Sequence, residues 1–542
     1  MSDHNTTSDE QKKEELKRIT LEAIAKECFD KSSSEHNDLR IISEGLAAGR
    51  ELELTILTGG LCNYSYKVHF KDERDDDVAL FAKMTFGAPL SFPGVSCSLN
   101  RTNCEYEMME LYSRVSPFPE STVTPYFCID VDCEEDNTKI LVTQFAPSNL
   151  EEQAGHVFID GGVIDTAFAS KLAKGFAALH NAEVTDPDFN KDMKPFFMAL
   201  AGMLPTMFDG FLGIADELDS NAQAEPESEH ELPSSLAAQF AQSKGKEKLD
   251  RVCEVYNECL QRTDCYVHGD AHAFNILVEG KSKNLSEIVA SLTNETSSSG
   301  DFCLIDWEMT HVGPMGKDIG LVTAFPVACL CAHAAQGDTV SAESILEFLD
   351  ALWSEYSKAI DLEGRDDHLS LVDVYRQVLG FGGLMMQGYS AIGFHMDYLP
   401  IEEGPNADAI AATARESLGL LGMKALFWGF GEDGEIATLE ELKGWFHDAI
   451  KEELQRLVPA VKKVRKSRRS SLLRTTGRRV SDSHVFFKLS EDFGRASLSS
   501  ATTDPTSSGS GSHTLVGRRR SLAVTRASIL EMEKLMAHMN YD

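Results

Sequence analysis

Residues 266–280 read YVHGDAHAFNILVEG and place two histidines, an aspartate and an asparagine between two apolar runs. A later stretch, residues 302–320 (FCLIDWEMTHVGPMGKDIG), puts Asp306 directly after an apolar run, with Glu308 shortly behind it. We predict that the two stretches form a hairpin-like pair of strands, each of which ends in a polar loop. The function of the chain depends on what these two loops hold.

The residue types in these loops suit phosphoryl transfer from ATP. That reaction needs a carboxylate that orients the acceptor hydroxyl, oxygen ligands for magnesium and a cation on the phosphates. Asp270 can accept the hydroxyl proton, while Asn275 and Asp306 offer the oxygen atoms that magnesium prefers. Lys83 lies on an expected strand, residues 77–86 (DVALFAKMTF), and supplies the cation.

A carboxylate on the helix that follows this strand is expected to pair with Lys83, and two candidates compete. Glu105 shares a helical face with Met108 and Tyr112, so we expect it to point into the protein. Glu107 lies on a less apolar face of the same helix. We therefore predict that Glu105 is the partner of Lys83.

The composition limits the class of protein and its partners. The chain has 542 residues, 42% of them apolar, which is enough for two or more packed units. Residues 459–542 contain 16 Lys+Arg and 7 Asp+Glu, and their net charge of +9 leaves −44 for residues 1–458. An acidic body argues against nucleic acid as the main partner, because binding to phosphates needs clustered cations.

Cysteine usage and hydropathy predict a cytoplasmic protein without a membrane partner. The twelve cysteines are scattered, and they form no CxxC pair. The polar N-terminal stretch contains no apolar run of the kind that a signal peptide needs. The longest apolar stretch, residues 320–335 (GLVTAFPVACLCAHAA), contains a proline, and we expect it to fall short of a membrane span.

The composition and the spacing of apolar residues change three times along the sequence. These changes predict four parts. Residues 1–50 form an N-terminal extension with one or two helices, and residues 51–148 form a small lobe of strands with one helix. Residues 149–458 form a mostly helical lobe, with polar inserts near 215–245 and 281–300. Residues 459–542 are a basic, Ser/Arg-rich tail that we expect to be mostly disordered. This order predicts an α+β fold with a small antiparallel-sheet lobe and a larger helical lobe.

The motifs resemble a known superfamily of small-molecule kinases. The order of Lys83, Glu105, HGDAHAFN (268–275) and IDWE (305–308) resembles the aminoglycoside phosphotransferase and choline kinase superfamily, which has a bilobal, protein-kinase-like fold. Residues 57–68 (LTGGLCNYSYKV) are similar to the phosphate-loop strand of choline and ethanolamine kinases. The C-terminal half is similar to 5-methylthioribose kinase in three pieces: GPMGKDIG (313–320), GFGGLMMQGYSAIGFHMDYLPIEE (380–403) and RESLGLLGMKAL (415–426).

The resemblance implies ATP and Mg²⁺ as cofactors and a small-molecule acceptor. It implies Asp270 as the catalytic base, with Asn275, Asp306 and Glu308 around the metal. The expected structural supports of the catalytic loop are His268 and Asp318. The implied nucleotide-binding positions are Gly59, Gly60, Asn63, Lys83, Glu105, Gln144, Phe145 and Ala146.

Two departures from the methylthioribose kinases leave the acceptor open. Those enzymes generally lack the asparagine found here at Asn275. They also carry an arginine pair near the substrate, where this chain has Gln387, Gly388 and Tyr389. The acceptor is therefore either a sugar or thiosugar such as methylthioribose, or an amino alcohol such as choline or ethanolamine. Choline would need an aromatic and acidic cage, for which Trp353, Trp428 and Phe430 are the candidates.

Two other classes of protein stay open. The first is a catalytically silent kinase-fold protein that binds or regulates, but such relatives commonly lose at least one of the residues that are intact here. The second is a binuclear metallophosphatase, because residues 269–272 (GDAH) resemble its first motif and His268 and His272 could be ligands. That class needs a later Gly-Asn-His motif, and this sequence contains no Gly-Asn pair.

The basic tail carries three sites of one pattern. Ser471, Ser481 and Ser521 each lie three residues after the first arginine of a pair, in RRSS, RRVS and RRRS. Such sites suit basophilic protein kinases, whose acidic pockets bind the arginines. We therefore predict phosphorylation of the tail by such a kinase. Separately, we keep a homodimer open as the oligomeric state.

Overall fold

The computed structural model of the chain describes most of residues 4–468. The described segments are residues 4–31, 36–57, 63–72, 78–88, 97–132, 137–147, 149–150, 152–193, 202–212, 235–279, 300–363, 369–392, 399–431 and 438–468. They form two compact units, one built from residues 1–99 and 126–145 and the other from residues 100–125 and 146–466.

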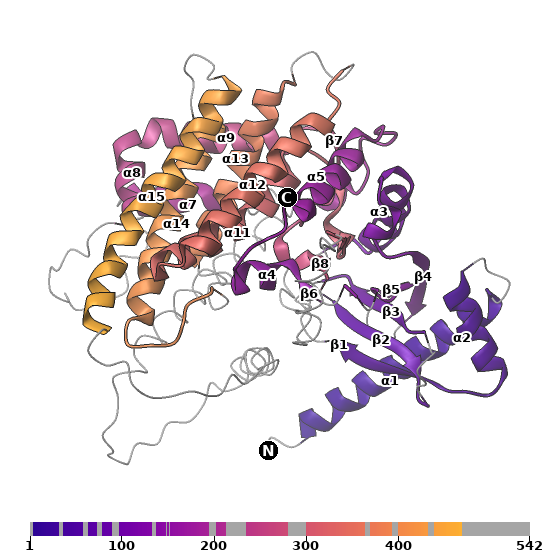
Figure 1. The fold of residues 1–542 in the computed structure, drawn as a ribbon. Coiled ribbons are helices and arrows are strands. Elements are labelled where there is room, and N and C mark those ends of the chain that lie inside the picture. Colours follow the sequence, from indigo (N-terminus) through magenta and orange to yellow (C-terminus); the bar gives the residue numbers. More distant parts are fainter. Residues whose placement is uncertain are drawn as a thin grey trace. The chain divides into compact units, whose positions relative to one another are not determined.

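The smaller unit is built on an antiparallel sheet in which the strand order is β1-β2-β3-β5-β4 (Figure 1). Its strands are β1 (Leu52–Leu57), β2 (Tyr64–Phe70), β3 (Leu80–Phe86), β4 (Pro125–Asp132) and β5 (Asn137–Gln144). Lys83 lies in the middle of β3, opposite Ser65 of β2 and Leu141 of β5. A central strand position holds the lysine backbone by hydrogen bonds on both sides.

The N-terminal extension is part of this unit and not an appendage. It forms α1 (His4–Asp30) and α2 (Asn37–Ala47), as predicted, but both helices pack on the sheet (Figure 1). Ile24 and Ile42 are fully buried in one cluster with Val68 and Phe70 of β2. The apolar positions of the two helices are spaced for one face, and that face needs the sheet to cover it.

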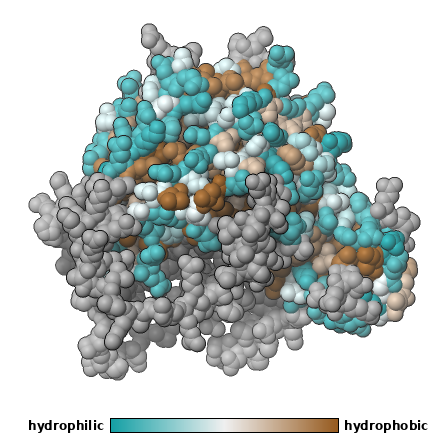
Figure 2. All heavy atoms as spheres, viewed as in Figure 1, coloured by the Kyte–Doolittle hydropathy of each residue, from teal (hydrophilic) through white to brown (hydrophobic). Residues whose placement is uncertain are grey.

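The larger unit is mostly helical, with three short strand pairs. Its longer helices are α3 (Asn100–Val115), α4 (Ala154–Asp160), α5 (Thr166–Asn181), α7 (Met203–Leu212), α8 (Leu236–Lys244), α9 (Lys246–Leu260), α11 (Lys317–Gln336), α12 (Thr339–Ala359), α13 (Leu371–Gln387), α14 (Ala407–Phe430) and α15 (Leu439–Arg468). Its strands are β6 (Glu152–Gln153), β7 (Cys265–Val267), β8 (Ile276–Val278), β9 (Phe302–Leu304) and β10 (His311–Gly313). On the face drawn in Figure 2, hydrophilic residues cover much of this unit and apolar residues are scattered between them.

Helix α11 is the central helix of the larger unit. By length and composition alone this helix could cross a membrane, whereas we predicted that its apolar stretch would be too short. Its apolar window is nevertheless 100% buried by the surrounding helices, which identifies it as a core helix. Cys329 and Cys331 on this helix are both fully buried and are free thiols.

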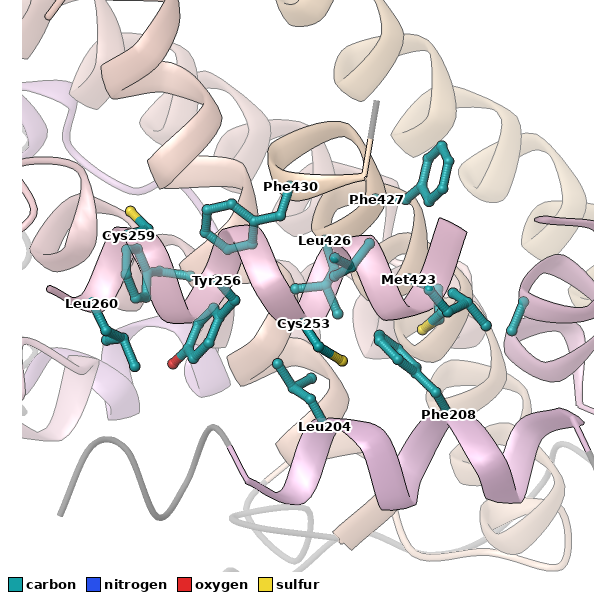
Figure 3. Close-up of a cluster of buried hydrophobic side chains, with 14 of the residues drawn as sticks. Leu204, Phe208, Cys253, Tyr256, Cys259, Leu260, Met423, Leu426, Phe427 and Phe430 are labelled. Carbon is teal, nitrogen blue, oxygen red and sulfur yellow. The ribbon is translucent and has the colours of Figure 1, made fainter. Parts of the chain in front are cut away.

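A second part of the core joins α7, α9 and α14. Figure 3 shows Leu204 and Phe208 of α7 pointing toward α9, and Tyr256 of α9 and Phe430 of α14 belong to the same cluster. The ring centroids of Tyr256 and Phe430 lie 5.5 Å apart in an edge-to-face contact. Phe430 is therefore a packing residue of this cluster.

The predicted α+β class is confirmed, and two helices extend across boundaries that we drew from the sequence. The first insert was expected to reach residue 245, but helix α8 occupies residues 236–244 and buries Ala237 and Ala241. The tail was expected to begin at residue 459, but α15 continues to Arg468. The rest of the first insert, the second insert and the three predicted phosphorylation sites lie outside the described residues.

Candidate active site

Two short antiparallel strand pairs bring the two polar stretches together, as the sequence predicted. β7 pairs with β10, so Val267 lies opposite His311, and β8 pairs with β9, so Ile276 lies opposite Leu304. We call residues 268–275 the HGD loop and residues 306–308 the DWE loop. The carbonyl oxygen of Asn275 accepts a hydrogen bond of 3.0 Å from the N–H of Ile305, which joins the ends of the two loops.

The side chain of Asp318 holds the HGD loop from the first turn of α11. Its two carboxylate oxygens accept hydrogen bonds from the backbone N–H groups of His268, at 2.7 Å, and Gly269, at 2.9 Å. Gly269 has a φ of +85°, and a Cβ there would collide with the carbonyl oxygen of Met309. Only glycine fits this turn, because the backbone is left-handed and has no free space.

A buried polar network extends from Asp318 into the helices. His180 Nε2 lies 3.1 Å from Oδ2 of Asp318, and His180 Nδ1 lies 2.7 Å from the hydroxyl of Tyr356. That hydroxyl donates to the carbonyl oxygen of Met315 at 3.2 Å. Burial by itself raises the pKa of Asp318, but the hydrogen bond with His180, the charges of His180 and His268 and the N–H of Gly269 lower it to about 2. Asp318 is therefore a carboxylate at neutral pH.

Within the HGD loop, Asn275 reaches back to Asp270. Its amide nitrogen donates to the backbone oxygen of Asp270 at 2.9 Å and to the carboxylate oxygen Oδ2 at 3.2 Å. The amide nitrogen of Asn275 is thus fully used, and its oxygen is the atom that remains for another ligand. The Asp270 side chain is 37% exposed, so it can be reached from solvent.

Asp306 opens the DWE loop in a strained conformation. Its φ of 64° and ψ of 60° are left-handed, which a residue with a side chain adopts at a cost. The next residue, Trp307, is fully buried, and its N–H donates to the carboxylate of Glu105 at 3.2 Å. Glu105 therefore points inward, as predicted from its helical face, and it fixes the residue next to Asp306.

The other acidic residue of the DWE loop, Glu308, is paired with an arginine that we did not predict. Arg101 Nε lies 3.4 Å from Oε2 of Glu308, and the two side chains are only 2% and 9% exposed. Arg101 precedes Glu105 by one helical turn on α3, so the two residues share a face. The sequence could have predicted a partner for Arg101 from this spacing, because a basic and an acidic residue on one buried helix face need partners from other parts of the chain.

Both nitrogens of His268 are used inside the protein. Nε2 lies 3.0 Å from the carbonyl oxygen of Ile305, and Nδ1 accepts from the N–H of Asp270 at 3.4 Å. Burial lowers the pKa of His268, although the carboxylates of Asp318, Asp270 and Asp306 oppose the shift. His272 uses Nδ1 to accept from the N–H of Phe274. These contacts do not suit a metal site built on the two histidines.

Lys317 is a further buried charge that the sequence reasoning missed. It precedes Asp318, is 4% exposed, and its Nζ lies 3.4 Å from Nε2 of His311. Burial lowers its pKa to about 7, and the charges of Asp318 and Asp270 act in the opposite direction. Position in the sequence gave no hint of this burial, because a lysine at a helix start is usually solvated.

The residues predicted to bind the nucleotide are divided between the two units. Asn63 and Lys83 are buried in the sheet unit, at 5% and 4% exposure. Gln144 ends β5, followed by Phe145 and Ala146, whereas Gly59 and Gly60 lie outside the described residues. Because Lys83 and Glu105 belong to different units, their pairing stays a prediction.

The elements described above define a class of fold. A lysine on the third strand of the sheet, a buried glutamate on the next helix, and an Asp…Asn loop followed by a second Asp loop are the ordered parts of protein-kinase-like folds. The antiparallel sheet unit and the larger, mostly helical unit of the predicted fold class are thereby confirmed.

Several solved structures are similar to this chain at low identity. An aminoglycoside phosphotransferase from Alicyclobacillus acidocaldarius is 10% identical over 76% of this chain and 92% of its own, with a TM-score of 0.34. Glucosamine kinase is 12% identical over 76% and 92%, with a TM-score of 0.30. The PAN3 pseudokinase from Neurospora crassa is 12% identical over 78% and 67%, with a TM-score of 0.23. No protein-family model and no curated protein matches the sequence.

Proposed function

We propose that this chain is a magnesium-dependent phosphotransferase that moves the γ-phosphoryl group of ATP to a hydroxyl group of a small molecule. One observation carries the proposal: Asp270, Asn275 and Asp306 are brought together at the ends of the paired strands β7–β10 and β8–β9. A reachable carboxylate beside two oxygen ligands is the set that phosphoryl transfer requires.

The donor atoms at this site fit Mg²⁺. Asp306 brings a carboxylate, and Asn275 brings an amide oxygen because its nitrogen is held by Asp270. Hard oxygen atoms of this kind suit Mg²⁺, which would neutralise charge on the phosphates of ATP. The role of Glu308 at the metal stays a prediction, since its carboxylate is paired with Arg101.

In the proposed reaction, Asp270 orients the acceptor hydroxyl and receives its proton. The acceptor oxygen forms a bond to the γ-phosphorus while the bond from that phosphorus to the β,γ-bridging oxygen breaks, and ADP leaves. Asp318 keeps the backbone at His268 and Gly269 fixed, so that Asp270 is presented in one orientation. Glu105 does the same for the DWE loop through the N–H of Trp307.

We propose a sugar or thiosugar as the first choice of acceptor and an amino alcohol as the second. Phe430 is buried in the core with Tyr256, and Trp353 lines a cavity that no residue of the HGD or DWE loop lines, which removes two of the three aromatic residues considered for a choline cage (Figure 3). Gln387 is also buried, and its amide donates to the carbonyl oxygen of Gly419. Gln387 therefore joins α13 to α14 and does not replace a substrate-binding arginine.

The test is a panel of acceptors with Mg²⁺ and ATP. ADP release is measured with sugars, thiosugars, amino alcohols and aminoglycosides, and we expect turnover with one class. In parallel, Asp306→Ala is expected to weaken the binding of Mg·ATP at least about tenfold, because a carboxylate ligand is lost. Isothermal titration calorimetry with and without Mg²⁺ measures that change.

The control is Asp188→Asn, which alters an exposed acidic residue whose side chain is 75% exposed. It should bind Mg·ATP like the natural chain. Magnesium-dependent ATP binding without turnover on any acceptor would favour the catalytically silent alternative. Unchanged binding of Mg·ATP in Asp306→Ala would sink the assignment of this site.

A further inference from the structure

His272 lies in the HGD loop between the proposed base, Asp270, and Asn275. Its backbone N–H donates to the carbonyl oxygen of Asp270 at 2.8 Å, and its side chain caps the short 3₁₀ helix that follows, Ala273–Asn275. The His272 side chain is 19% exposed, so the ring can be reached from solvent. The reaction proposed above gives this ring no role.

The backbone N–H of Phe274 fixes which ring nitrogen of His272 carries the hydrogen. This N–H donates to Nδ1 at 3.2 Å, so Nδ1 presents a lone pair and the ring hydrogen is on Nε2. Phe274 is itself held in place, because its carbonyl oxygen accepts from Gln153 at 2.9 Å and its ring packs on Phe325 at 4.8 Å between centroids. The capping contact therefore orients the imidazole ring as well as the backbone.

The Nε2–H of His272 is on the side of the ring next to Asp270. Nε2 lies 3.6 Å from the carboxylate oxygen Oδ2 of Asp270. This separation is longer than a hydrogen bond, but contacts between catalytic groups are often long before the substrates bind and shorten in the complex. The ring thus places a donor beside an acceptor on the proposed base.

The two donors beside the Asp270 carboxylate approach the same oxygen. The amide nitrogen of Asn275 donates to Oδ2 at 3.2 Å, and Nε2 of His272 lies next to Oδ2 as well. Among the described residues, no donor forms a hydrogen bond with Oδ1. Each oxygen of a carboxylate has its own lone pairs, so Oδ1 keeps its lone pairs for a proton.

We propose that His272 is a positioning residue of the phosphoryl-transfer reaction. Its Nε2–H and the amide of Asn275 hold Oδ2 of Asp270, and Oδ1 receives the proton of the acceptor hydroxyl. The inference rests on the proposed function, since it assigns the reacting oxygen of the base and the residue that orients it. In the transfer step the acceptor O–H bond breaks, its proton goes to Oδ1, and the acceptor oxygen bonds to the γ-phosphorus as ADP leaves. The ring hydrogen of His272 stays on Nε2.

Two substitutions separate the two contacts of the ring. In His272→Asn the side-chain amide reaches about as far as Nδ1, so it can still cap the turn but places no donor beside Asp270. In His272→Gln the amide reaches about as far as Nε2, so its N–H can approach Oδ2 while the acceptor for the Phe274 N–H is lost. A residue that only caps the loop and a residue that positions the base therefore predict opposite results.

Turnover is measured as ADP release from Mg·ATP, with water alone and with the acceptor that the panel identifies. We expect kcat to fall about tenfold in His272→Asn, the size of one hydrogen bond to a charged group, while the Kd of Mg·ATP stays the same. In His272→Gln kcat should fall only about threefold, but the thermal unfolding midpoint should fall further than in His272→Asn. The control His447→Asn, on α15, should change none of these quantities.

A measurement without nucleotide tests the contact itself. The full chain is labelled with ¹⁵N at its histidine rings, and the His272 signals are assigned by their loss in His272→Asn. We expect the NMR pattern of the tautomer that carries its hydrogen on Nε2. The Nε2 signal should also shift in Asp270→Asn, because the group next to it changes from a carboxylate to an amide.

Several results would overturn the positioning role and leave the proposed function in place. They are a His272 signal with the hydrogen on Nδ1, full kcat in His272→Asn, or a larger loss of kcat in His272→Gln than in His272→Asn. A natural chain that releases no ADP with any acceptor would instead overturn the proposed function, and this role with it. The natural chain therefore tells the two failures apart.

Discussion

Asp270 and Asp318 are both aspartates, one within the HGD loop and one that supports it. Their side chains differ in exposure to solvent and in hydrogen-bond partners. The Asp270 side chain is 37% exposed and contacts an asparagine and a histidine at the edge of the HGD loop. Asp318 is fully buried, and its carboxylate accepts from two backbone N–H groups beside His180.

In the proposed reaction, this difference separates a group that would react from a group that would position it. A catalytic base has to be reached by the substrate and has to accept its proton. A positioning carboxylate has to stay ionised, and burial with hydrogen-bond donors achieves this for Asp318. The following predictions test this division, from the largest effect to the smallest.

The largest effect is expected from Asp270→Asn. Turnover should fall about 10³-fold, because the amide cannot accept the proton of the acceptor hydroxyl. The binding of Mg·ATP and the thermal unfolding midpoint should change little, since the amide oxygen of this variant can still accept the hydrogen bond from Asn275. Steady-state kinetics, calorimetry and thermal unfolding measure the three quantities. Substantial residual turnover would show that Asp270 is not the base.

Asp318→Asn is expected to act on stability first. The change leaves His180 and two loop N–H groups facing an uncharged amide, so the free energy of unfolding should fall by about 3–5 kcal/mol. Denaturant unfolding measures the loss, and hydrogen exchange should show faster opening at the Gly269 N–H. A fall in turnover without any loss of stability would contradict the positioning role.

A third buried carboxylate, Glu308, sharpens the comparison. Arg101→Met should cost about 3 kcal/mol because it leaves Glu308 buried without its cation, and adding Glu308→Leu should recover most of the loss. Urea unfolding of the two single variants and the double variant provides the cycle. If the stable double variant also loses magnesium-dependent binding of ATP, Glu308 acts at the metal as well as in the pair.

The smallest effect concerns acid stability. The pKa of Asp318 is lowered from 3.8 to about 2, so its ionised form stabilises the fold. This contribution is fully present above the unfolded value and disappears as the pH falls from about 4 to about 2, amounting to about 2 kcal/mol. Unfolding curves across that pH range should be steeper in the natural chain than in Asp318→Asn, and parallel curves would contradict the assignment.

Much of the active-site region was predictable because it depends on local spacing. The hairpin-like pairing of the two polar stretches follows from apolar runs that end at the same loops, and the structure confirms it. The inward direction of Glu105 follows from its helical face. The N-terminal helices were predicted as helices, but their role in the core was missed, because sequence spacing does not reveal what covers an apolar face.

The amino-acid sequence by itself determined the order of the strands and helices and the identity of the polar side chains proposed for the site, Asp270, Asn275 and Asp306. Chain geometry over a few residues is enough for this, since strand and helix periods fix which side chains share a face. Only the tertiary structure decided the partners: Arg101 for Glu308, and His180 for Asp318. These choices join residues that are far apart in the chain, and they depend on packing and desolvation, which no local pattern contains.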